Sequence, residues 1–153
     1  MKYRVIIGLF IGIMSAPALC AANISVLVME SGENIENTGN QYPIIWENEI
    51  MAILFDAGHI VSNSPKMHVA GKVENDLPAE AEREFIEAKD GGMEYFLVAL
   101  IDYAAPMVIL RIFDIKSTKK VLEQKYAITS FKNTKNETDR IKTAIRVLSA
   151  QIK

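Results

Sequence analysis

The longest apolar pattern in the chain covers residues 93–128 and predicts the core of a β-sheet. Six consecutive apolar residues, Phe96 to Ile101, are typical of a strand that is covered on both faces. A second, mostly apolar segment, Met107 to Ile115, follows the pair Ala105-Pro106, which suits a tight reversal. The third segment, Val121 to Ile128, alternates apolar and polar side chains. We therefore expect an antiparallel meander whose strands become more exposed to solvent from the first to the third.

Before this meander, strand and helix patterns alternate along the chain. Asn23 to Glu30 is rich in β-branched residues and predicts a buried first strand. From Ile45 to Leu54, apolar residues recur at three- and four-residue steps, as on one face of a helix, and Gly58 is placed as its C-cap. Trp46 lies in this apolar stripe, so we interpret it as a core residue. The segment His59 to Asn63 then predicts a second short strand, which completes a parallel crossover unit.

The remaining segments predict a loop and two further helices. Ser64 to Pro78 contains scattered Pro, Gly, Asn and Asp residues, which predict an irregular loop that is long for a compact domain. Ala79 to Lys89 predicts a helix whose outer face carries glutamates, among them Glu80 and Glu84. After the meander, apolar residues at helical spacing from Ile141 to Ile152 predict a last helix.

Together these segments predict an α/β fold with the element order β-α-β-α-β-β-β-α. We expect a mixed five-stranded sheet with the strand order about 2-1-3-4-5, covered by three helices. Right-handed crossovers place the first and second helices on opposite faces of that sheet. This arrangement agrees with the unbroken apolar run of the third strand, which needs cover on both sides.

Residues 1–22 have the three-part form of a secretory signal. Lys2 and Arg4 precede an apolar run, and small residues follow, so that cleavage after Cys20 or after Ala22 fits the pattern. The apolar run is shorter than the roughly 20 residues that cross a bilayer. We therefore expect a removed leader over residues 1–22 and a single α/β domain over residues 23–153. Alternatively, Cys20 is a lipid-modified residue that tethers the domain to a membrane.

The charge and cysteine content of the mature chain exclude several classes of function. Residues 23–153 hold 15 of the 17 basic residues and all 19 acidic ones, a net charge of −4. A protein that binds nucleic acid is usually basic, so we expect no such partner. The one cysteine lies in the leader, so the mature chain has no thiol for a disulfide, a nucleophile or a metal ligand.

We find no motif for catalysis or for a cofactor. The two histidines, His59 and His68, stand nine residues apart without a set of metal ligands beside them. The chain has no Gly-x-Ser-x-Gly elbow and no glycine-rich phosphate loop. We therefore expect no enzymatic activity, no catalytic residues, no metal and no cofactor.

Three glutamates are candidates for a binding surface. Glu30, Glu33 and Glu36 lie at or just after the end of the first strand, beside the place where a parallel sheet that changes direction opens a crevice. Their carboxylates suit a small ligand or a cation. Carboxylates are also common in solvated turns that are rich in Asn and Gly, as this segment is. The sequence leaves both readings open.

Two segments resemble known envelope domains. Ile50 to Val61 passes from a helix through Gly58 into a strand, and Ala88 to Ile101 passes from a helix through a glycine turn into the central strand. This pattern is similar to that of bacterial envelope domains of the TolB N-terminal, CsgG and LpoB type, and the resemblance covers most of the mature chain. It implies a periplasmic or membrane-tethered domain that binds other envelope proteins and catalyses nothing.

The leading hypothesis is an exported, non-enzymatic cell-envelope domain, located in the periplasm, that acts by protein–protein contacts. Its expected partners are other envelope proteins, which bind loop and helix surfaces that include Glu80 and Glu84. Contact with a membrane is expected only if Cys20 is lipidated or the leader is retained. The alternative is a periplasmic domain that binds a small ligand in the crevice near residues 30–40 and the loop Ser64 to Pro78.

Overall fold

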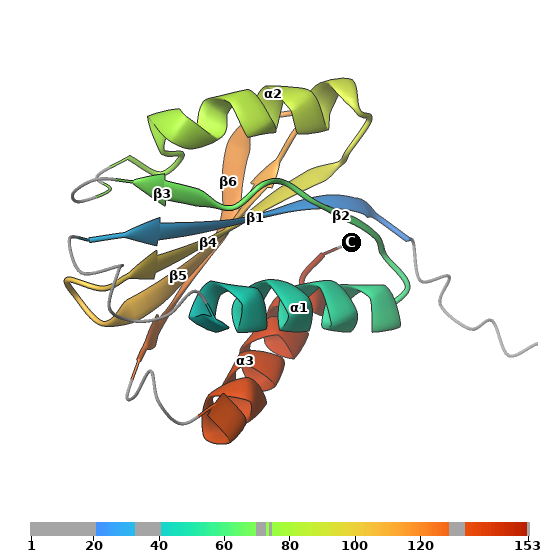
Figure 1. The fold of residues 1–153 in the computed structure, drawn as a ribbon. Coiled ribbons are helices and arrows are strands. Elements are labelled where there is room, and N and C mark those ends of the chain that lie inside the picture. The colour runs from blue at the N-terminus through green and yellow to red at the C-terminus, as the bar shows by residue number, and fades with distance from the viewer. Residues whose placement is uncertain (1–20, 33–40, 70–72, 74, 129–133, 153) are drawn as a thin grey trace, which may run out of the picture.

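A mixed β-sheet forms the middle layer of the molecule, with helices on both of its faces (Figure 1). The computed structural model describes residues 21–32, 41–69, 73, 75–128 and 134–152. The main strands lie in the order β2-β1-β4-β5-β6. In chain order these strands are β1 (Asn23–Ser31), β2 (Ile60–Asn63), β4 (Tyr95–Asp102), β5 (Met107–Asp114) and β6 (Lys119–Ala127). The predicted α/β class and strand order are confirmed.

The apolar segment Phe96 to Ile101 lies at the centre of the sheet, as its sequence predicts. It belongs to β4, which pairs in parallel with β1 and in an antiparallel way with β5. All six of its residues are buried, because helices cover both faces of the sheet at this strand.

The sheet also contains a short strand that the sequence pattern did not predict. Within the segment Ser64 to Pro78, expected to be irregular, residues Met67–Val69 form β3. This strand pairs in parallel with Met29–Ser31 of β1, on the same side as β2. His68, which we expected in a loop, therefore lies in a strand. Three residues are too few to show the alternation by which a strand is recognised in a sequence.

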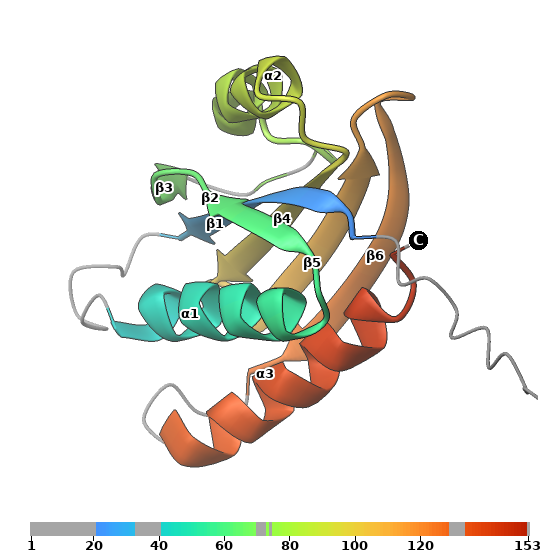
Figure 2. The same ribbon diagram turned by 90° about the vertical axis from the view of Figure 1, so that its right-hand side faces the viewer.

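The helices divide between the two faces of the sheet, as predicted. Helices α1 (Gln41–Asp56) and α3 (Thr134–Ser149) lie side by side on one face (Figure 2). Helix α2 (Glu82–Asp90), which follows the 3₁₀ turn η2 (Ala79–Ala81), covers the other face. Among the described residues, no helix is both long and apolar enough to cross a bilayer.

Each face of the sheet has its own apolar core. Alternate residues of β1 point to opposite faces, so Val26 packs with Trp46 of α1, whereas Leu27 packs with Phe85 of α2. The ring of Phe85 meets that of Phe96 edge to face, with their centroids 5.5 Å apart. Trp46 is buried, which confirms its interpretation as a core residue.

Candidate functional site

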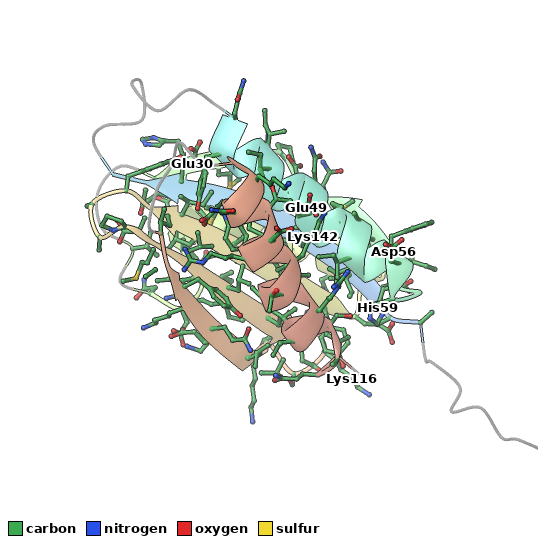
Figure 3. The ribbon with its side chains drawn as sticks, turned by 90° about the horizontal axis from the view of Figure 1, so that it is seen from below. Glu30, Glu49, Asp56, His59, Lys116 and Lys142 are labelled. Atoms are coloured by element: carbon green, nitrogen blue, oxygen red, sulfur yellow. The ribbon has the colours of Figure 1, made fainter. Side chains whose placement is uncertain are left out.

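The carboxyl end of β1 holds the first of the predicted site residues. The Tyr103 hydroxyl donates a hydrogen bond to Glu30 Oε1 over 2.6 Å, and His68 lies beside Glu30 in the register of β1 and β3. Figure 3 shows Glu30 from the side of the sheet that α1 and α3 cover. Glu33 and Glu36 lie outside the described residues, and so does Cys20.

The described part of the chain contains no group of three or more His, Cys, Asp or Glu side chains that is placed to bind a metal ion. Glu30, in particular, has the Tyr103 hydroxyl as its hydrogen-bond donor.

The predicted site residues Glu80, in η2, and Glu84, in α2, lie in different environments. Glu80 is exposed, as expected, but Glu84 is only 2% exposed, so its predicted place on the outer face is wrong. Glu84 lies three residues after Ala81 and four before Ala88, and both of these alanines face the sheet. Residues at these spacings share one face of a helix, which brings the Glu84 side chain inward.

Glu84 lines a polar cleft of about 200 Å³ between α2 and the edge of the sheet. Ser25 of β1 and Ser62 of β2 are partners in the parallel register, so their side chains lie next to each other on the face that α2 covers. The lining residues come from β1, β2, the segment after β2 and α2 with the turn that follows it, and they are Ser25, Ser62, Asn63, Ser64, Pro65, Glu84, Glu87, Ala88 and Met93.

Arg83 connects the two carboxylates of the cleft. Its Nη2 lies 2.9 Å from Glu84 Oε1, and its Nε lies 3.5 Å from Glu87 Oε1. The Glu84 carboxylate is the main cause that raises the pKa of the Arg83 guanidinium. Because the Arg83 side chain is 73% exposed, this cation reaches the buried carboxylate from the solvent side of the helix.

The serines of the cleft and Arg83 were not among the site residues predicted from the sequence. Ser25 is the polar residue inside the buried run Ile24 to Met29, and it lies where α2 covers the sheet. A polar residue in a strand that is buried on both faces is the sequence signal that could have predicted the cleft. Its partner Ser62 lies in a strand too short to carry such a signal.

On the other face, a buried polar link joins α1, α3 and β6. The Tyr42 hydroxyl donates to Glu137 Oε1 over 2.6 Å, and Arg140 Nη1 lies 3.5 Å from Glu137 Oε2. Arg140 Nη2 also donates to the Ala127 carbonyl over 2.8 Å. Burial, and next the bond to Glu137, raise the pKa of Tyr42. A groove of about 410 Å³ runs along α3 beside this link, lined by Tyr126, Asp139, Arg140, Thr143, Ala144 and Val147.

Charges of opposite sign lie on different parts of the molecule. Residues 114–153 hold ten Lys and Arg against four Asp and Glu, whereas residues 23–113 hold five against fifteen. The first group includes the edge strand β6 and helix α3, which meet where Arg140 donates to the Ala127 carbonyl. Helices α1 and α2 belong to the second group. We call β6 together with α3 the basic edge of the fold, and the part that residues 23–113 form the acidic remainder.

The sequence matches no protein-family model, and a search of curated proteins finds no match. The structure is similar to solved structures of bacterial proteins. One is the PelC dodecamer from Paraburkholderia phytofirmans, with 13% identity over 86% of this chain and 90% of that chain and a TM-score of 0.53. At this identity the likeness shows the fold alone.

LpoB and TolB, which the sequence segments resemble, are also among the similar structures, so the comparison finds the resemblance that the sequence predicts. The LpoB C-terminal domain from Escherichia coli has 12% identity over 76% of this chain and 90% of that chain, with a TM-score of 0.46. TolB from Acinetobacter baumannii has 11% identity over 86% of this chain and 30% of that chain, with a TM-score of 0.45.

Proposed function

We propose that this protein is an exported, non-enzymatic domain of the bacterial cell envelope that acts by binding other proteins. The separation of charge between the basic edge and the acidic remainder of the fold carries this proposal. Surfaces of opposite sign favour and orient protein–protein association, because complementary potentials steer partners together and exclude wrong ones. The envelope proteins among the similar structures support the location.

The outer face of α2 is the acidic contact surface in this proposal. Ile86 is 56% exposed there, and Glu82 and Asp90 lie one helical turn before and after it, both of them exposed. Glu80 precedes this helix and is also exposed. An exposed aliphatic side chain among carboxylates fits a partner that has an apolar spot within a basic surface.

The PelC structure is that of a dodecamer, which supports contacts between copies of this chain as one form of association. The basic edge of one copy fits the acidic α2 of another by charge. Such a contact uses two different surfaces, so repeated contacts give a ring or a filament. Envelope proteins with a basic surface are the other partners that fit.

A pull-down with the mature domain tests the acidic surface. We expect the domain to retain a defined set of envelope proteins or its own copies at low salt and to lose them near 1 M salt, where the screening length falls to about 3 Å. The variant Glu80→Lys/Glu82→Lys should lose the same proteins, whereas Asp56→Lys, which reverses an exposed charge at the end of α1 (Figure 3), should retain them. Equal retention by both variants contradicts the proposal.

The proposed location has its own test. The mass of the processed N-terminus in a bacterial host distinguishes cleavage after Cys20, cleavage after Ala22 and lipidation of Cys20. Either cleaved form in the periplasmic fraction supports an exported domain, and a lipidated Cys20 supports a membrane-tethered one. An unprocessed chain in the cytoplasmic fraction contradicts both.

A further inference from the structure

We infer that the polar cleft between α2 and β2 binds a small ligand through a primary ammonium group. This site lies away from the carboxyl end of β1, where the sequence placed its candidate crevice, and from the outer face of α2. The inference depends on the Glu84 carboxylate, on the serine hydroxyls below it and on the size of the space between them.

The Glu84 carboxylate has donors on only one of its two oxygens among the described residues. Its side chain is 2% exposed, and both hydrogen bonds that it accepts come from Arg83 to the same oxygen, Oε1. Oε2 has no donor among the described residues. A buried carboxylate is costly unless it is paired and hydrogen-bonded. A donor that enters the cleft can bond to Oε2, the oxygen that Arg83 leaves free.

The floor of the cleft consists of hydroxyls with unused hydrogen-bonding capacity. Ser25 and Ser64 have their Oγ atoms 3.5 Å apart, and among the described residues Ser62 donates to the Met93 sulfur alone, over 3.9 Å. Each hydroxyl has one donor and two acceptor positions, so these long contacts leave acceptors free. Ser25 is almost completely buried and shares the α2 face of β1 with the core residues Leu27 and Met29. Packing alone gives no reason for a polar residue there.

The volume of the cleft limits the size of the ligand. A space of about 200 Å³ is smaller than the roughly 300–1,000 Å³ of sites for drug-sized molecules. It corresponds to about six or seven water molecules, since each takes about 30 Å³ in the liquid. Pro65, Ala88 and Met93 supply an apolar part of the lining. A short aliphatic chain that ends in a polar group fits these dimensions and this lining.

Acceptors outnumber donors in the cleft, and this selects an ammonium group. The carboxylates of Glu84 and Glu87 and the serine oxygens all accept, whereas an ammonium group has three donors and no acceptor. In the proposed complex the ammonium donates to Glu84 Oε2 and to the serine hydroxyls, while Arg83 keeps its bond to Oε1. An anionic ligand would instead be repelled by the carboxylates of Glu84 and Glu87.

Titration of residues 21–153, the chain that cleavage after Cys20 would leave, with n-propylamine tests the inference, and 1-propanol serves as its uncharged counterpart. We expect saturable amide chemical-shift changes at Ser62, Ser64 and Ala88 with n-propylamine at about pH 7, where the amine is protonated, and none with 1-propanol. Equal changes with both compounds, or the same saturable changes with sodium or calcium chloride, would overturn it.

Two variants locate the binding group. Glu84→Gln keeps the shape of the side chain but removes its charge, so we expect at least about tenfold weaker binding of n-propylamine, the loss of one charge-assisted hydrogen bond. The matched control Glu80→Gln removes a charge outside the cleft and should bind like the wild type. If Glu84→Gln does not fold, Ser62→Ala takes its place and should also weaken binding. Wild-type affinity in a folded Glu84→Gln or Ser62→Ala variant would overturn the inference.

Discussion

The backbone N–H of Ala22 donates a hydrogen bond to Nδ1 of the buried His59 over 3.2 Å. The Ala22 carbonyl in turn accepts from the N–H of Ile60 over 3.0 Å, and Ala22 itself is 3% exposed. The folded domain therefore includes Ala22, one residue before the start that the sequence predicted at Asn23. Cleavage of the leader after Cys20 keeps these contacts, whereas cleavage after Ala22 removes them.

A chain that starts at Asn23 should be less stable than one that starts at Ala21. It loses the two hydrogen bonds of Ala22, one to the His59 side chain and one from the Ile60 N–H, and a buried methyl group, which together contribute about 1–3 kcal/mol to the free energy of unfolding. Urea unfolding of the two chains at pH 7 measures the difference. Equal stability would show that the contacts of Ala22 contribute nothing, and would remove this reason to favour cleavage after Cys20.

His59 should make the stability of the fold depend on pH. Burial lowers the pKa of His59 below its ordinary value of 6.5. Below about pH 6.5 the unfolded chain therefore binds a proton more readily than the folded chain, so the free energy of unfolding falls as the pH drops through this value toward the lower folded pKa. In His59→Asn, which keeps an acceptor near Nδ1, the loss of stability between about pH 7 and pH 5 should be smaller.

The other histidine provides the control for this experiment. His68 is exposed, and the chain has only these two histidines. His68→Asn should therefore keep the wild-type dependence on pH in urea unfolding. The same flattening in both variants would mean that the effect does not come from the burial of His59.

The central part of the fold was predictable because its physical signal is local and long. The six apolar side chains from Phe96 to Ile101 point alternately to both faces of the strand, so all of them are buried only if both faces are covered. This requirement places β4 in the middle of the sheet. β3 was not predictable from its own three residues. It exists because β2 ends at Asn63 while β1 continues to Ser31, which leaves a free edge that Met67–Val69 can pair with.

The candidate site was predictable only in part, because it depends on which side chains the fold brings together. Glu84 could have been placed inward from its spacing to Ala81 and Ala88, but the number of glutamates in this helix suggested a solvated face. The neighbouring positions of Ser25 and Ser62 follow from the register of two strands that are 37 residues apart in the chain, which no local pattern contains.

An ion network around Glu123, between β5 and β6, should stabilise the fold at neutral pH. Glu123 accepts from Lys120 Nζ over 2.8 Å and from Arg111 Nε over 3.0 Å. Arg111 Nη1 also donates to the backbone carbonyls of Asn75 and Asp76. Lys120 first, and then Arg111 and Lys125, lower the pKa of Glu123 to about 2. The carboxylate therefore connects β5 and β6 at the place where the segment before α2 crosses the sheet.

Glu123→Gln should lower the free energy of unfolding by about 1–3 kcal/mol at pH 7, because Arg111 is buried and loses its charged partner. In the wild type the contribution is complete above the ordinary pKa of 4.5 and is lost as the pH falls toward about 2. The difference between the two proteins should therefore shrink at about pH 3. Urea unfolding at both pH values measures it, with the exposed Glu82→Gln as control. A difference that does not change with pH would contradict the assignment to the charge of Glu123.

Two links of different burial connect α1 and α3. Glu137 is buried and accepts from Tyr42 over 2.6 Å, whereas Lys142 and Glu49 form a partly exposed ion pair at 3.7 Å (Figure 3). Because a buried acceptor loses its donor, Tyr42→Phe should cost about 1–3 kcal/mol in the free energy of unfolding. Lys142→Met should cost less than about 1 kcal/mol, since water screens the exposed pair. A double-mutant cycle of Tyr42→Phe with Glu137→Gln isolates the coupling, and a coupling no larger than that between Lys142→Met and Glu49→Gln would show that burial adds nothing to this link.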